Sequence, residues 1–179
     1  MAAVLPEGLS VTTETFGAIA PSRRVRLRGV ADTHAWGARL GALLKAGDLL
    51  VLTGGLGAGK TTLTQGIAHG LGVRGPVTSP TFVIARVHPS LVGGPDLVHV
   101  DAYRLGGLAE LDDLDLDASL EGAVTVVEWG HGVAEQLSDD YLEVTLSGHH
   151  TRTVELVGHG GRWIAQGAGA QLDDLVHLP

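Results

Sequence analysis

Apolar residues recur along two stretches of the chain with the spacing of amphipathic helices. In the first stretch they stand at positions i, i+4, i+7 and i+8, which are Trp36, Leu40, Leu43 and Leu44. Asp32 or Thr33 is a suitable N-cap and Gly47 follows the last apolar position, so the pattern predicts one helix between them. The second stretch repeats this spacing at Leu63, Ile67 and Leu71. We expect its helix to end at Gly72.

Short runs rich in Val and Leu lie around these helices and predict the strands of a sheet. They span residues 24–30, 48–53, 82–87, 97–100 and 123–127. Apolar and polar residues alternate at 141–147 and 151–157, across the turn "GHH", which predicts an antiparallel hairpin at the sheet edge. Because strands and helical segments are interleaved, we expect a three-layer α/β fold with a largely parallel central sheet.

A chain of 179 residues favours a single domain with one core. We assign this domain to residues 22–157. Residues 1–21 show no sustained period and are predicted to form a flexible N-terminal lead-in. Residues 158–179 are rich in Gly and Ala, so we expect a peripheral C-terminal tail there.

Composition removes several classes of function. Lys and Arg number 12 against 20 Asp and Glu, a formal net charge of −8, so the surface as a whole repels nucleic acids. The absence of cysteine excludes disulfides, thiolate metal sites and a cysteine nucleophile. The pattern shows neither a signal peptide nor an apolar run long enough to span a membrane, which favours a cytoplasmic protein.

The stretch "VLTGGLGAGKTTL" carries the strongest chemical signal. Gly54, Gly59, Lys60 and Thr61 match the phosphate-binding pattern G-x-x-x-x-G-K-[ST] between a predicted strand and a predicted helix. Glycines let backbone N–H groups surround a phosphate, and the helix N-terminus points its positive end at the same anion. Lys60 is suited to reach the β- and γ-phosphates of a nucleoside triphosphate, and the Thr61 hydroxyl is suited to bind Mg²⁺. The expected class is therefore a P-loop NTPase-like domain.

Two predicted strands end in carboxylates. "LVHVD" ends at Asp101 and "VTVVE" ends at Glu128. Ligands of open α/β sheets collect at the carboxyl ends of parallel strands, so both acids are expected to meet the phosphates. Sequence alone leaves open which acid serves Mg²⁺ and which orients the attacking water. Ser79 or Thr81 in "VTSPTF" is either a sensor of the γ-phosphate or part of an ordinary Ser-Pro turn.

Two further groups of residues admit more than one interpretation. The carboxylates at 110–117 form a solvated face or a surface for a partner. His149, His150 and His159 lack the supporting ligands at fixed spacing that a metal site needs.

Four motifs together resemble the TsaE family, the P-loop ATPases of bacterial tRNA threonylcarbamoyladenosine biosynthesis. They are "GGLGAGKTTL", "SPTF", "HVDAYRL" and "VVEWG", in this order and spacing. The resemblance implies a Mg²⁺-dependent ATPase that works with a threonylcarbamoyltransferase subunit and its non-catalytic paralogue. ATP hydrolysis would reset that assembly between turnovers, and tRNA would be met only through the complex.

The resemblance also implies roles for individual residues. The phosphates would be bound by Gly57, Ala58, Gly59, Lys60, Thr61 and Thr62. Thr61 and Glu128 would hold Mg²⁺, and Asp101 would be the acid needed for hydrolysis. Thr33 would correspond to the family's threonine before the first helix, with the adenine near residues 31–33. The chain departs from the family at Gly55, where an aspartate is usual, and in the "LDLD" of the acidic segment.

Two other functions remain open at this level. A small-molecule kinase would use the same loop but needs a lid with several arginines, whereas the arginines here are scattered. A nucleotide-gated interaction module would bind ATP with scarcely any turnover. A GTPase signature of the Asn-Lys-x-Asp kind is excluded because the chain contains no asparagine.

Overall fold

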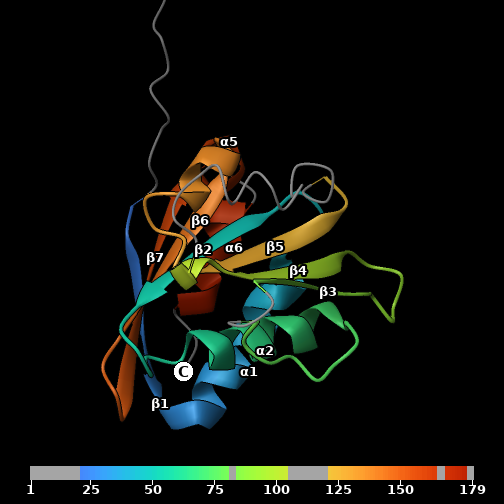
Figure 1. The fold of residues 1–179 in the computed structure, drawn as a ribbon. Helices are drawn as coiled ribbons and strands as arrows, with labels where there is room; N and C mark the ends of the chain where they lie inside the picture. Colours follow the sequence, from blue (N-terminus) through green and yellow to red (C-terminus); the bar gives the residue numbers. More distant parts are fainter. Residues whose placement is uncertain (1–20, 81–83, 105–120, 165–167, 177–179) are drawn as a thin grey trace, which may run out of the picture.

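The computed structural model describes residues 21–80, 84–104, 121–164 and 168–176, and these form a seven-stranded sheet with helices packed on it (Figure 1). The strand order across the sheet is β1-β7-β6-β2-β5-β4-β3. In chain order the elements are β1 (Arg23–Arg28), α1 (Gly29–Leu43), β2 (Leu49–Gly54), α2 (Lys60–Leu71), β3 (Ala85–His88), β4 (Asp96–Asp101), η1 (Ala102–Arg104), β5 (Ala123–Glu128), η2 (Ala134–Leu137), β6 (Tyr141–Ser147), β7 (Thr151–His159), α5 (Gly161–Ile164) and α6 (Ala168–Val176).

The four neighbouring strands β6, β2, β5 and β4 run parallel, which confirms the predicted parallel centre of the sheet. Their carboxyl ends therefore share one edge. At that edge Glu128 of β5 pairs with Leu52 on one side and with Asp101 on the other. The register alone thus brings the two predicted acids onto adjacent strands beside the end of β2.

The outer strands are antiparallel. β6 and β7 form the predicted hairpin, and β3 pairs with β4 at one edge of the sheet. β1 pairs with β7 along its whole length, so β1 forms the other edge and the hairpin lies one strand further inside. Val25 and Leu27 alternate with arginines and indicated a strand, but alternation carries no information about the partner.

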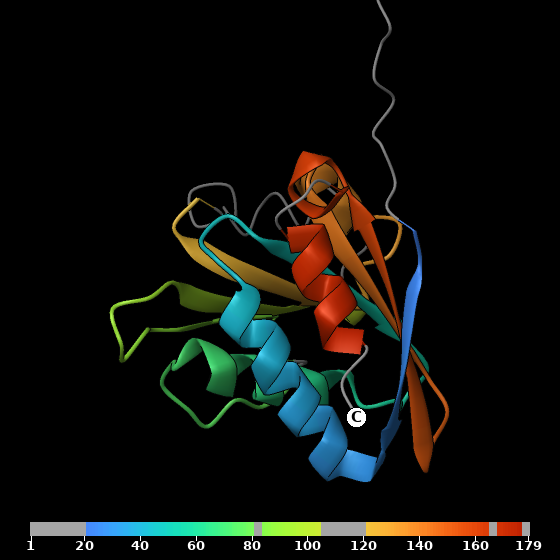
Figure 2. The same cartoon turned by 180° about the vertical axis from the view of Figure 1, so that it is seen from behind.

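Apolar clusters cover both faces of the sheet. On one face α1, α2 and α6 bury Leu50 and Leu52 of β2, and Figure 2 shows α1 and α6 side by side on that face. On the opposite face Leu49 and Val51 pack in a smaller cluster that includes Ala134 of η2. Because both faces are covered, β2 is a continuous apolar run and not an alternating one.

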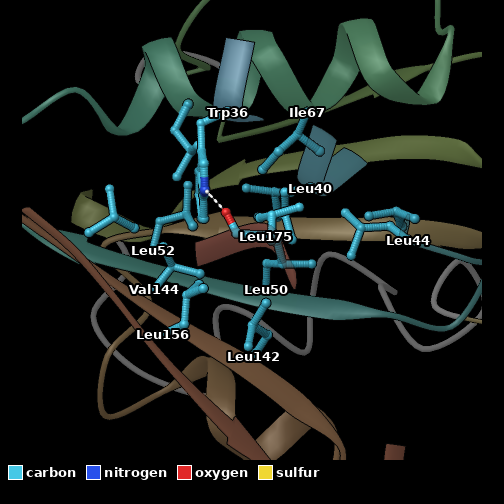
Figure 3. Close-up of a cluster of buried hydrophobic side chains, with 14 of the residues drawn as sticks. Trp36, Leu40, Leu44, Leu50, Leu52, Ile67, Leu142, Val144, Leu156 and Leu175 are labelled. Atoms are coloured by element: carbon cyan, nitrogen blue, oxygen red, sulfur yellow. Dashed lines mark hydrogen bonds between the residues drawn. The ribbon is translucent and has the colours of Figure 1, made fainter. Parts of the chain in front are cut away.

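Trp36 anchors α1 in the larger cluster. Its indole Nε1 donates a hydrogen bond to the Leu175 carbonyl of α6 at 3.3 Å (Figure 3). Further along α1, a Cβ on Gly41 would clash with the Ile67 carbonyl of α2. The two helices therefore pack backbone against backbone, which only a residue without a side chain permits.

The C-terminal segment is part of the core, so the prediction of a peripheral tail at 158–179 is wrong for its described residues. Trp163, Leu172 and Leu175 are 1%, 0% and 5% exposed. α6 packs against α1 and β1, and Arg23 forms an ion pair with Asp173 across this contact. The high Gly and Ala content concealed the helical spacing of Ala168, Leu172 and Leu175, which lie on the buried face.

Several predicted boundaries shift. α1 begins at Gly29 and not at Asp32 or Thr33, because Gly29 turns the chain with φ +78° and the Asp32 carboxylate accepts a hydrogen bond from the Arg28 backbone N–H. β3 begins at Ala85, later than predicted. The lead-in at 1–20, Thr81 and the acidic segment at 110–117 lie outside the described residues. Within the described ranges, no helix has the length and apolar character needed to cross a bilayer.

Candidate functional site

The glycine loop joins the end of β2 to the start of α2, as the motif requires. Gly54, Gly57 and Gly59 have φ angles of +140°, +76° and +104°, a region in which side chains are strained. Gly59 is the N-cap of α2 and offers no capping side chain. The first N–H groups of α2 therefore face the loop uncapped by any side chain, which is the arrangement that binds an anion.

A cavity of about 350 Å³ opens beside this loop. Its described lining consists of Leu56, Gly57, Gly59, Lys60, Thr61, Thr62, Ser79, Asp101, Glu128, Trp129 and Arg152. The structure thus brings nearly all of the predicted phosphate and metal residues to one place. Within the loop, Ala58 is the predicted residue that does not line the cavity, and it is buried at 5% exposure.

Lys60 is held inside the cavity by the loop itself. Its Nζ donates to the carbonyls of Gly54 at 2.8 Å and Gly55 at 3.1 Å. The same atom lies 3.7 Å from the centre of the Trp129 ring. Burial lowers the pKa of Lys60 below its usual 10.5, and the nearby carboxylates of Glu128 and Asp101 act in the opposite direction. The amino group of Lys60 is therefore held at the loop by two backbone carbonyls and the Trp129 ring.

Glu128 meets the Thr61 hydroxyl, as a shared metal site would require. Thr61 Oγ1 donates to Glu128 Oε2 at 3.2 Å, and Glu128 is 3% exposed. On the other carboxylate oxygen, Oε1 accepts from the ring of His99, whose Nε2 lies 2.8 Å away. His99 is completely buried on β4, so it fixes the orientation of Glu128 from behind. A hydroxyl and a carboxylate are the oxygen ligands that Mg²⁺ prefers.

Asp101 lies beside this pair and is 4% exposed. Its carboxylate accepts hydrogen bonds from the Ser79 hydroxyl and from the Tyr103 backbone N–H, both at 3.1 Å. Ser79 belongs to the "VTSPTF" segment, so one of its two candidate sensor residues contacts an acid of the site. The other, Thr81, is outside the described residues.

Trp129 shapes the cavity wall. It follows Glu128 directly and has a φ of +61°, an uncommon conformation for a bulky residue. Its ring packs at a tilt against Tyr103, with 5.2 Å between the ring centres, while it lines the cavity beside Lys60. The turn at Trp129 thus places an aromatic face at the cavity immediately after the strand-terminal acid.

Thr33 is a second predicted site residue that does not line the cavity. It is completely buried, and its hydroxyl donates to the Gly29 carbonyl at 2.8 Å. A residue without exposed atoms makes no direct contact with a nucleotide, so this structure gives no support to a contact between Thr33 and the adenine. His149, His150 and His159 are not part of any group of three or more His, Cys, Asp or Glu side chains that could hold a metal ion, within the described residues.

Two residues of the site were missed at the level of sequence. His99 stands two positions before Asp101, and residues two apart on a strand share a face, so the period of "VHVD" was the available signal. Arg152 likewise shares its face with Val154 and Leu156, both completely buried. A charged residue on the apolar side of an alternating strand is a departure from the pattern that marks a candidate.

A parallel sheet, a glycine loop opening a helix and two strand-terminal acids beside it define a P-loop NTPase-like α/β protein. Comparison with protein families gives a match over residues 27–154 to the family described as threonylcarbamoyl adenosine biosynthesis protein TsaE. The chain belongs to the TsaE family.

Individual relatives agree with this assignment. The chain is 60% identical over 134 residues to a Streptomyces coelicolor protein called tRNA threonylcarbamoyladenosine biosynthesis protein TsaE, an alignment that covers 71% of this chain and 90% of the relative. A Mycobacterium tuberculosis protein of the same name is 57% identical over 124 residues, covering 65% and 74% of the two chains. The crystal structure of Bacillus subtilis YdiB superposes with a TM-score of 0.67 at 30% identity, covering 87% of this chain and 94% of that one.

Proposed function

We propose that this protein is the Mg²⁺-dependent ATPase subunit of the assembly that makes threonylcarbamoyladenosine in tRNA. The observation that carries the ATPase part is the contact between Thr61 and Glu128 beside Lys60 at the mouth of the glycine loop. The pathway follows from the TsaE family and from the names of its relatives.

The residues at the loop fit a magnesium nucleotide. Gly57 and Gly59 turn the backbone without side chains, and Lys60 adds a positive charge next to the N-terminus of α2. The phosphates would be held by Gly57 to Thr62, and Mg²⁺ by Thr61 and Glu128. The ion would neutralise charge on the phosphate oxygens.

In this proposal Asp101 would orient the attacking water. Its buried carboxylate accepts hydrogen bonds from the Ser79 hydroxyl and the Tyr103 backbone N–H, and it lines the same cavity as Glu128. A carboxylate in this position accepts a hydrogen bond from water and directs the lone pair of the oxygen toward the phosphate. Ser79, which donates to Asp101, would link the position of this acid to the 77–82 segment.

The partners we propose are the threonylcarbamoyltransferase subunit and its non-catalytic paralogue, in the cytoplasm. ATP hydrolysis resets this assembly between turnovers and does not itself form the modification. The net charge of −8 supports indirect contact with tRNA, because a surface of this sign attracts a polyanion only through a partner or a local patch.

Reconstitution with these partners tests the proposal. ATP hydrolysis is measured for the chain alone and with the transferase pair and tRNA, beside Asp101→Ala and Glu128→Ala. We expect low turnover alone, a marked rise in the complex, and loss of that rise in both variants. Absence of any rise with authentic partners would reject the proposal. A phosphorylated metabolite would then identify a kinase, and tight ATP binding without turnover would identify a nucleotide-gated interaction module.

A further inference from the structure

A second cavity, of about 440 Å³, lies along β1 at the edge of the sheet. Its described lining shares no residue with that of the cavity beside the glycine loop. Side chains of a strand alternate between two faces, so consecutive residues of β1 meet one cavity only along the strand edge. We refer to this cavity as the β1 groove. It is lined by Val25 to Arg28 of β1, by Asp32, Ala35, Trp36 and Arg39 of α1, and by Leu175 of α6.

The backbone of β1 faces this groove without a partner strand. Among the described strands β1 pairs with β7 alone, at the edge of the sheet (Figure 2). The Gly29 N–H donates toward β7, to the His150 carbonyl at 3.0 Å. The Arg28 N–H points the other way and donates to the Asp32 carboxylate at 2.9 Å. Alternate residues of an antiparallel strand direct both backbone groups to the same side, so Arg26 presents its N–H and C=O groups to the groove.

Three arginines line the groove against a single acid. Arg26 and Arg28 come from β1 and Arg39 comes from α1, and all three are exposed. Their guanidinium groups form no salt bridge or hydrogen bond with another described residue, whereas Arg24, outside the groove, pairs with Glu155. In a chain with a net charge of −8, the groove is therefore a local positive surface that attracts an anionic partner.

The lining of the groove also distinguishes it from an edge that is only protected. Charged side chains commonly shield a free edge strand from pairing with other chains. Here they surround a recess whose lining includes Trp36 and Leu175, both 5% exposed, and the small side chain of Ala35. Such a recess leaves room for the side chains of an added strand, which project alternately to its two sides.

We propose that the β1 groove binds an extended peptide of a partner protein that is rich in Asp and Glu and adds to the sheet beside β1. The peptide backbone pairs with the free N–H and C=O groups of Arg26, and the peptide carboxylates accept hydrogen bonds from the groove arginines. A nucleic acid would meet the same arginines, but its backbone lacks the alternating donors and acceptors that pair with a strand edge. The groove is thus a docking site separate from the glycine loop.

Fluorescence anisotropy tests this proposal with labelled probes of defined chemistry. The first probe is a peptide of alternating Glu and Thr, and the second alternates Glu and Pro, which carries the same charge but has no N–H at every second residue. An oligouridine of equal charge is the third. Each is titrated with the wild-type chain, with Arg26→Gln/Arg39→Gln and with the control Arg24→Gln/Arg74→Gln, which removes two exposed arginines outside the groove. Unfolding temperatures show whether each variant keeps its fold.

We expect the wild-type chain to bind the Glu-Thr peptide, and Arg26→Gln/Arg39→Gln to bind it about 10-fold more weakly, because two charged contacts are lost. The control should stay within about twofold of wild type, and the Glu-Pro peptide should bind the wild type at least about 10-fold more weakly than the Glu-Thr peptide.

Four results would overturn the proposal. Absence of Glu-Thr binding by the wild type would mean that the arginines only protect the edge. Equal affinity for the two peptides, or equal loss in both double variants, would reduce the effect to general attraction of charge. Tighter binding of oligouridine that depends on the groove arginines would assign the groove to nucleic acid. Self-association of the wild type in sedimentation, lost in Arg26→Gln/Arg39→Gln, would assign it to a second copy of this chain.

Discussion

The parallel strands β2, β4 and β5 and the antiparallel strands β1 and β7 contribute to the molecule in different ways. The parallel part ends in the glycine loop and two acids, and each of these is visible as a motif or as the last residue of an apolar run. The antiparallel part, with α6 packed beside it, carries no such motif, yet it supplies core side chains and Arg152. The site residues of the parallel part can thus be recognised from short sequence motifs. The contribution of the antiparallel part depends instead on strand register.

The largest effect is expected from Lys60→Ala, which removes the principal cation of the parallel part. ATP hydrolysis in the assembled complex should fall by at least about 100-fold, because a positioned charge on the phosphates is lost. Lys45→Ala is the matched control, since Lys45 is the only other lysine and is exposed. Similar rates in both variants would mean that the loop does not perform the chemistry.

Leu172→Ala tests whether α6, which packs beside the antiparallel strands, belongs to the hydrophobic core. Leu172 is completely buried, so the truncation should lower the free energy of unfolding by about 2–5 kcal/mol. Gln171→Ala, at an exposed neighbouring position, should change it by less than about 0.5 kcal/mol. Urea unfolding measures both. A small effect of Leu172→Ala would restore the view of a peripheral tail.

His99→Leu tests whether His99 orients the Glu128 carboxylate through their hydrogen bond. Loss of the hydrogen bond to Oε1 should reduce Mg²⁺-dependent hydrolysis by about 10- to 100-fold and raise the Mg²⁺ concentration needed for half-maximal rate. His99→Gln keeps an N–H donor and should retain more activity. If both variants need the same Mg²⁺ concentration as wild type, His99 is only a packing residue.

Arg23→Gln probes the link between β1 and α6. The variant loses the ion pair with Asp173 and a hydrogen bond to the Gly169 carbonyl, and we expect a loss of about 1 kcal/mol in unfolding free energy. Arg24→Gln removes a more exposed pair with Glu155 and should cost less. The reverse order in chemical denaturation would show that α6 is not held through Arg23.

The smallest expected effect is on the pH dependence of stability, and it comes from His88 on β3, which does not line the cavity. Burial lowers its pKa below 6.5, so the unfolded chain binds more protons than the folded one as the pH falls below this value. Stability should therefore decrease on acidification, and His88→Gln should show a shallower decrease between pH 7.5 and 5.5. Equal slopes for the two proteins in urea titrations would contradict this.

From the sequence we predicted the strands, the glycine loop and the two acids of the parallel part. For the antiparallel part we predicted only the first strand and the hairpin. Lys60, Asp101 and Glu128 were predicted as site residues because short motifs mark them. Lys60 belongs to the glycine loop, and Asp101 and Glu128 end apolar runs. Arg152 was missed because its place at the cavity depends on strand register, and α6 was missed because its Gly- and Ala-rich sequence concealed the helical spacing. The adenine contact expected at Thr33 came from the family resemblance alone, and Thr33 is a completely buried residue of α1.

Binding of ATP with and without Mg²⁺ to wild type and Glu128→Gln tests the central claim most directly, because it isolates the Thr61–Glu128 contact from the partners. We predict that Mg²⁺ tightens ATP binding by the wild-type chain, and that this gain is largely lost when the carboxylate becomes an amide. Mg²⁺ dependence that is absent in the wild type, or unchanged in Glu128→Gln, would contradict a magnesium nucleotide site at the carboxyl ends of β2, β4 and β5.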